Sequence, residues 1–83
     1  MNLYLISQTE KDDYDTFDAA VVAAPNADDA RNIHPGYEDG RLVNWDGNLC
    51  EWCSALEHVS AVLIGVAPVG TPKGVILASF NAG

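Results

Sequence analysis

The stretch Thr16-Phe17-Asp18-Ala19-Ala20-Val21-Val22-Ala23-Ala24, which is followed by Pro25, decides the fold class. Its alanines would suit a helix, but the central Val21-Val22 pair and the proline at its end favour a strand. The segment Leu3-Tyr4-Leu5-Ile6-Ser7-Gln8 is likewise rich in strand-favouring residues. We therefore expect 3–8 and 16–24 to be two strands that pair with each other.

A short helix is predicted directly after this pair. Asn26 is a suitable N-cap, and Asp28 and Asp29 would stand in the first turn, where the helix dipole favours negative charge. Pro35-Gly36 stops the helix, which we expect over 26–34. Its narrow apolar face would consist of Ala27, Ala30 and Ile33.

Two more strands are expected near the C-terminus, over Val59–Ala67 and Val75–Phe80. Because a Pro- and Gly-rich turn joins them, they are predicted to form a hairpin. Before them, residues 35–54 form a long irregular loop that contains both tryptophans. Ser54 with Glu57 three residues later matches a capping box.

The predicted order is ββαββ, and the economical arrangement is a small two-layer α+β domain. It would combine an antiparallel sheet, one short helix and the long irregular loop. The chain length of 83 residues fits a single domain over 1–83. No apolar run reaches the roughly 18 residues that span a bilayer, and the N-terminus lacks a signal-peptide pattern. A cytoplasmic protein is expected.

The charge of the chain is strongly one-sided. A formal net charge of −8 argues against binding to nucleic acid or to an anionic membrane, because neutralising phosphates requires Lys and Arg. Seven carboxylates lie between Glu10 and Asp29 against one lysine, Lys11. Aromatic side chains among carboxylates can supply contact area while the charges attract Arg and Lys on a partner. The predicted partner-binding residues are Asp12, Asp13, Tyr14, Asp15, Asp18, Asp28 and Asp29.

Metal binding is a weaker candidate. Cys50 and Cys53 form a CxxC motif, and His58 follows five residues later, but only one such pair is present. Reduced thiols without a metal are therefore favoured, and no cofactor is expected. The acidic segment also lacks the glycine and glutamate that an EF-hand loop requires.

No catalytic signature accompanies these features. The serines have no nucleophile-elbow context, and no glycine-rich phosphate loop follows a predicted strand. The sequence therefore predicts a binding protein rather than an enzyme.

Several segments together resemble a family of small uncharacterised phage and prophage proteins. They are 3–9, 14–24, 30–35 and the ending 74–83. The resemblance carries no catalytic residues and implies a phage-encoded accessory protein that acts in the bacterial cytoplasm. By class and charge the chain is similar to anti-CRISPR and other anti-defence proteins.

The leading hypothesis is an inhibitor that occupies the basic nucleic-acid-binding surface of a host complex, such as a CRISPR effector, and blocks access to DNA. One alternative is a protein that sequesters a signalling nucleotide, which would require Arg31, Arg41 and Lys73 to converge. Another is a structural or assembly protein of the phage, in which an unpaired edge strand would allow a homodimer. A zinc-stabilised module is the last.

Overall fold

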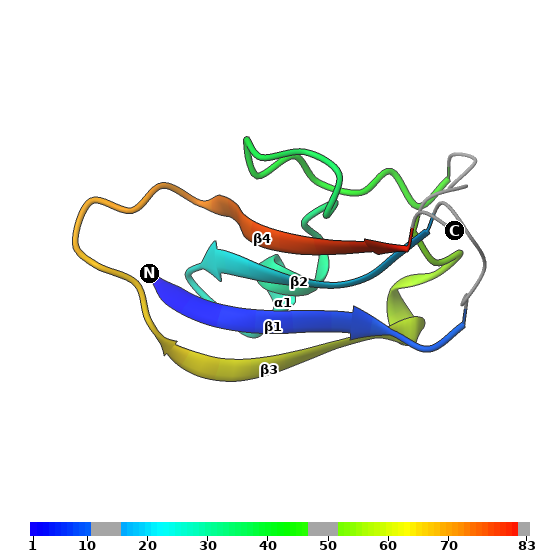
Figure 1. The fold of residues 1–83 in the computed structure, drawn as a ribbon, viewed down its shortest axis with the longest axis horizontal. Coiled ribbons are helices and arrows are strands. Elements are labelled where there is room, and N and C mark those ends of the chain that lie inside the picture. The colour runs from blue at the N-terminus through cyan, green and yellow to red at the C-terminus, as the bar shows by residue number, and fades with distance from the viewer. Residues whose placement is uncertain (11–15, 47–51, 82–83) are drawn as a thin grey trace.

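Among the residues that the structure describes, four strands form one antiparallel sheet, accompanied by one short helix and a 3-10 turn (Figure 1). The computed structural model describes residues 1–10, 16–46 and 52–81. The elements are β1 (Asn2–Gln8), β2 (Thr16–Ala24), α1 (Ala27–Arg31), η1 (Leu56–His58), β3 (Val59–Val66) and β4 (Gly74–Asn81). The expected α+β class with an antiparallel sheet is therefore confirmed.

The strand order is β3-β1-β2-β4, so the two N-terminal strands lie at the centre. β1 pairs with β2 as the sequence predicts, with Leu5 opposite Val21. The predicted C-terminal hairpin is wrong, because β3 pairs with β1 and β4 pairs with β2 at opposite edges. The connection over 67–73 runs past the end of the sheet instead (Figure 1). Seven residues reach more than 20 Å when extended, which exceeds the roughly 14 Å between the two edge strands.

The core lies between the sheet and the segments that cover one of its faces. Tyr4 and Ile6 of β1 and Val22 of β2 point to this side and are buried. Ile33, just after α1, and Trp52 complete the cluster and are fully buried. The helix therefore covers one face of the sheet, and it lies behind the strands in Figure 1.

The two tryptophans have different roles. Trp52 is the largest fully buried side chain, and its indole N–H meets no acceptor among the described residues. Leaving such a buried donor unpaired costs about 1–3 kcal/mol, which the apolar burial of the ring must offset. Trp45 is half-buried, and its indole N–H donates to Asn32 Oδ1 at 2.9 Å. Trp52 is thus a core residue. Trp45 instead connects the loop that contains it to the C-cap of α1 through this hydrogen bond.

The helix begins as predicted and ends early. Asn26 is the N-cap, and its Oδ1 accepts from the Asp29 backbone N–H at 2.8 Å. The helix stops at the C-cap Asn32 rather than continuing to 34. The chain turns away there because Asn32 O accepts from Val43 N–H at 2.7 Å, and Ile33 forms an isolated antiparallel bridge with Leu42. In the described part of the chain no helix is long and apolar enough to cross a membrane.

Two glycines allow the loop after α1 to approach β4 closely. Gly40 has a φ of 77°, and a Cβ atom there would lie 2.7 Å from the backbone oxygen of Lys73. Gly74, with a φ of 153°, would place a Cβ atom 2.4 Å from the backbone oxygen of Glu38. Backbone therefore packs directly on backbone at the start of β4, and a side chain at either position would separate the two segments.

Replacing Gly40 by alanine should destabilise the protein more than replacing Gly70 by alanine. Both residues have a positive φ, 77° and 90°, so each variant carries a left-handed strain of about 1–2 kcal/mol. A Cβ atom at Gly70 would meet nothing within 4 Å, whereas one at Gly40 would meet Lys73. The contact should add about 1–3 kcal/mol to the loss at Gly40, measured by urea unfolding. Equal losses in the two variants would contradict the close approach.

Candidate functional site

The acidic residues predicted to bind a partner are only partly within the described residues. Asp12, Asp13, Tyr14 and Asp15 lie outside them. Asp18 is exposed near the start of β2, where the register against β4 shifts between Phe17 and Ala19. The extra residue at this β-bulge is Asp18, and so the carboxylate stands where the regular pairing is interrupted.

Asp28 and Asp29 lie in the first turn of α1, which follows the other end of β2. The Asp28 side chain is 90% exposed, and its Oδ1 lies 3.7 Å from Arg31 Nη1. An exposed pair at this distance contributes little to stability. Since β2 separates Asp18 from the helix by roughly 20 Å of strand, the structure does not bring all the described members of the predicted set together.

The predicted set of partner-binding residues omits a second group of exposed carboxylates, in the loop after α1 and in η1. The group consists of Glu38, Asp39, Asp46 and Glu57. Within it, Asp39 Oδ2 lies 3.6 Å from Arg41 Nη2, and the Arg41 guanidinium carbon lies 4.1 Å from the centre of the Tyr37 ring. The excess of acidic residues between 35 and 54 was the available signal. Acidic side chains are therefore distributed over several segments rather than gathered at one.

Two basic side chains, Arg31 and Arg41, are paired within the chain. Arg31 Nε donates to Val59 O at 3.0 Å, and its Nη2 donates to Leu56 O at 3.1 Å. It therefore joins α1 to η1 and to the start of β3. Because Arg31 is committed to these carbonyls and Arg41 to Asp39, the geometry does not favour their convergence on a phosphate.

Glu10, Ser54 and His58 form a polar cluster next to η1. Glu10 accepts from the Ser54 backbone N–H through Oε2 and from the Ser54 hydroxyl through Oε1, both at 2.6 Å. His58 Nε2 lies 3.7 Å from Glu10 Oε1. The carboxylate thus stands between serine and histidine, whereas a nucleophilic serine requires a histidine beside its hydroxyl. The cluster fits a structural role.

The predicted capping box of Ser54 and Glu57 is wrong. The residue before η1 is Ala55, and no side chain caps this turn. Ser54 makes its side-chain hydrogen bond with Glu10, which is 44 positions away in the sequence. A contact across the fold has therefore replaced the local one.

The candidate metal ligands are not assembled in the described part of the structure. Cys50 lies outside the described residues. Cys53 is fully buried and its thiol donates to Ala55 O at 3.5 Å, while His58 is exposed beside Glu10. Residues 1–10, 16–46 and 52–81 contain no group of three or more His, Cys, Asp or Glu side chains that could hold a metal ion.

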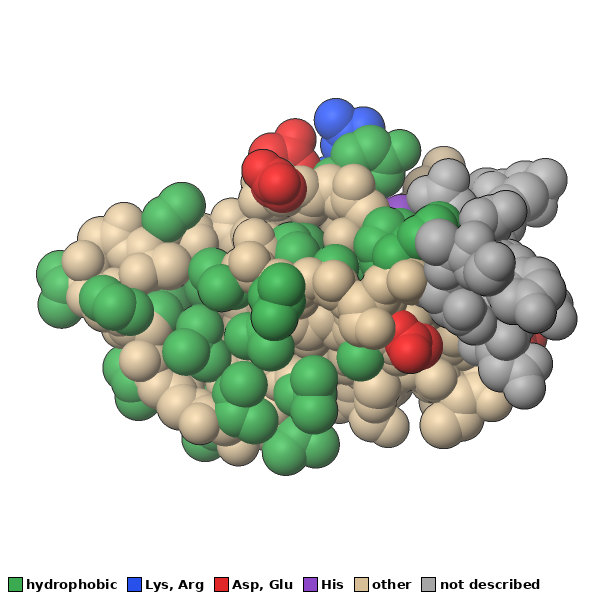
Figure 2. All heavy atoms as spheres, viewed as in Figure 1, with side chains coloured by type: hydrophobic (Ala, Val, Ile, Leu, Met, Phe, Trp, Pro, Cys, Tyr) green, Lys and Arg blue, Asp and Glu red, His purple; other side chains and the backbone are tan. Residues whose placement is uncertain are grey.

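The face of the sheet opposite α1 is the feature that the sequence analysis did not identify. We call it the open face, and its central row is Val62, Leu5, Val21 and Leu77, paired across the four strands. Figure 2 shows hydrophobic side chains gathered over these strands. The signal was present in β1, where Leu3 and Leu5 alternate with Tyr4 and Ile6, so that both faces receive apolar residues.

No protein-family model, curated protein or solved structure matches this chain. The resemblance to phage proteins therefore stays a prediction. The function is inferred from the two surfaces described above, the exposed carboxylates and the open face.

Replacing Arg31 by alanine should destabilise the protein by about 1.5–3 kcal/mol, because it removes two hydrogen bonds from a charged donor. The matched control is Arg41→Ala, which changes the net charge equally. The Arg41 side chain is 57% exposed, so its loss should cost less than about 1 kcal/mol. Urea unfolding of both variants measures the difference. Similar losses would refute the structural role of Arg31.

Proposed function

We propose that this chain is a non-catalytic inhibitor that binds a basic, nucleic-acid-binding surface of a host defence complex, such as a CRISPR effector, and blocks its access to DNA. The observation that supports the proposal is the charge imbalance at the surface. Arg31 and Arg41 are engaged within the chain, while Asp18, Asp28 and Asp46 are exposed. A partner rich in Arg and Lys would therefore meet carboxylates with few cations to repel it.

Long-range electrostatics would bring the two proteins together. A net charge of −8 on 83 residues produces a negative field that extends about one Debye length, roughly 8 Å at physiological salt. The basic channels that hold nucleic acid in CRISPR effectors have the complementary charge. Carboxylates distributed over several segments can follow such a channel as phosphates do.

The polar groups within the fold support binding rather than catalysis. The Ser54 hydroxyl donates to Glu10, and His58 lies beside the same carboxylate, so His58 is not placed to activate the serine. Cys53 is buried and His58 is exposed, so this pair is not arranged as two ligands of one ion. The described surface can therefore bind a partner through charged groups and through apolar contact.

The biological setting belongs to the same proposal. The predicted resemblance of 3–9, 14–24, 30–35 and 74–83 to small phage proteins supports a setting in the cytoplasm of an infected bacterium. The ββαββ domain would then serve as a scaffold that holds acidic segments at the ends of its strands.

The first test is a tagged pull-down from the lysate of a bacterium that carries defence systems, washed at low and at high salt and read by mass spectrometry. We expect a nucleic-acid-binding complex to be recovered at low salt and lost at high salt, because salt screens exposed charges. Added DNA should then compete with the tagged protein for the purified complex. Recovery of no such complex, or binding that DNA does not weaken, would refute the proposal.

Two triple variants test where the partner binds. In one, Asp18, Asp28 and Asp29 become asparagine; in the control, Glu38, Asp46 and Glu57 become glutamine, asparagine and glutamine. Each raises the net charge by three units, so a general charge effect weakens binding equally. If the interface lies at the predicted residues, the first variant should lose at least tenfold more affinity for the complex than the control. A larger loss of affinity in the control variant would indicate that the interface lies at the loop after α1 instead.

A further inference from the structure

The central row of the open face lacks the polar side chains that a solvent-exposed sheet face normally carries. In antiparallel sheets with one wet face, residues that point away from the core are mostly polar. Here the central row is apolar throughout, and Val62 and Leu77 are 56% and 69% exposed. The neighbouring row consists of small uncharged residues, Ser60, Ser7, Ala19 and Ser79. A face of this composition is typical of a sheet that another layer covers.

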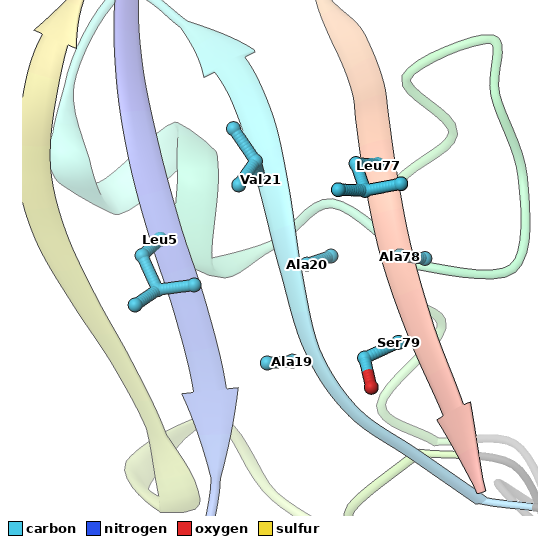
Figure 3. Close-up of a pocket in the computed structure, with 7 residues that line it drawn as sticks. All are labelled: Leu5, Ala19, Ala20, Val21, Leu77, Ala78 and Ser79. Carbon is cyan, nitrogen blue, oxygen red and sulfur yellow. The ribbon is translucent and has the colours of Figure 1, made fainter.

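The shape of the open face provides both a ridge and a hollow. Leu5 of β1, Val21 of β2 and Leu77 of β4 form the ridge, and the small side chains of Ala19 and Ser79 stand in the next row (Figure 3). These residues, together with Ala20 and Ala78, line a shallow hollow of about 290 Å³. That volume corresponds to roughly ten water molecules, enough for apolar side chains of a facing sheet. Ridge and hollow on one face can fit a second copy of the same face.

The charges of the chain favour a second copy as the occupant. Asp18 is the one Asp, Glu, Lys or Arg residue in the sequences of the four strands, although the chain carries a net charge of −8. Two such molecules repel each other wherever their acidic segments meet, and the central row of the open face is where they can approach with no carboxylate in the row itself. A basic partner would instead be drawn to the acidic segments, since the central row of the open face offers it no carboxylate.

We propose that two copies pack open face against open face, forming a four-layer dimer with the two helices outside. Four strands at about 4.8 Å spacing and about 26 Å in length cover roughly 500 Å². Two copies would therefore bury about 1,000 Å², the lower limit for a specific interface. Sheets stacked in this way pack about 10 Å apart through interdigitating side chains. The pairing goes beyond the proposed function and does not depend on it.

Analytical ultracentrifugation of the purified chain tests the dimer, with Leu77→Lys as the diagnostic variant and Leu63→Lys as its control. Leu63 is 60% exposed, close to the 69% of Leu77, but it pairs with the buried Tyr4 and so lies on the helix side of the sheet. We expect the wild type and Leu63→Lys to sediment at twice the monomer mass of 8.9 kDa. Leu77→Lys should sediment as a monomer, because facing lysines would be buried without partners.

Far-UV circular dichroism checks that each variant folds, and Val62→Lys on the same row is a second variant that should also give monomers. A wild-type chain that stays monomeric at high concentration overturns the proposal. So does dissociation by Leu63→Lys but not by Leu77→Lys, which would indicate pairing through the edge strand β3. Added salt should strengthen the dimer by screening repulsion, whereas it should weaken binding to a basic partner, so the two proposals fail separately.

Discussion

The antiparallel register of β1 against β2 is the constraint on which the rest of the structure depends. With Leu5 opposite Val21 and Tyr4 opposite Val22, one set of alternate residues enters the core and the other set faces outward. A shift of one residue would exchange the two sets along both central strands. Because both sets are apolar in β1, the covering by α1 and its loops, not hydrophobicity alone, decides which face is buried. The open face exists because the described covering segments, α1 and its loops, lie on one side of the sheet.

Sequence reasoning succeeded where local chemistry decides the outcome. The strands, the pairing of β1 with β2 and the Asn26 cap follow from residue type and spacing over a few positions. It failed where distant segments compete. The turn residues between β3 and β4 predict a reversal but do not specify which strands pair, and Ser54 binds Glu10 from across the fold. The early end of α1 likewise depends on Val43, which no local pattern connects to Asn32.

The features of the candidate surfaces also differ in whether the sequence predicts them or only the tertiary structure shows them. An acidic surface follows from composition, and the exposure of Asp18 and Asp28 agrees with it. The commitment of Arg31 to two backbone carbonyls is a tertiary feature, since nothing in its sequence neighbourhood places Leu56 and Val59 within reach. The open face could have been inferred from the alternation in β1, but only the strand order shows that its residues form one row.

The separation of charge from apolar surface links the two proposals physically. A chain with this net charge can associate with itself only through a surface that keeps carboxylates apart, and it can attract a basic partner only through a surface that presents them. Placing almost no charge on the strands and most of it in the connecting segments meets both requirements. A dimer built on the open face would leave two acidic surfaces exposed. Where a partner offers two basic sites in reach, the second contact would form at a high effective concentration and so strengthen binding without any new residue.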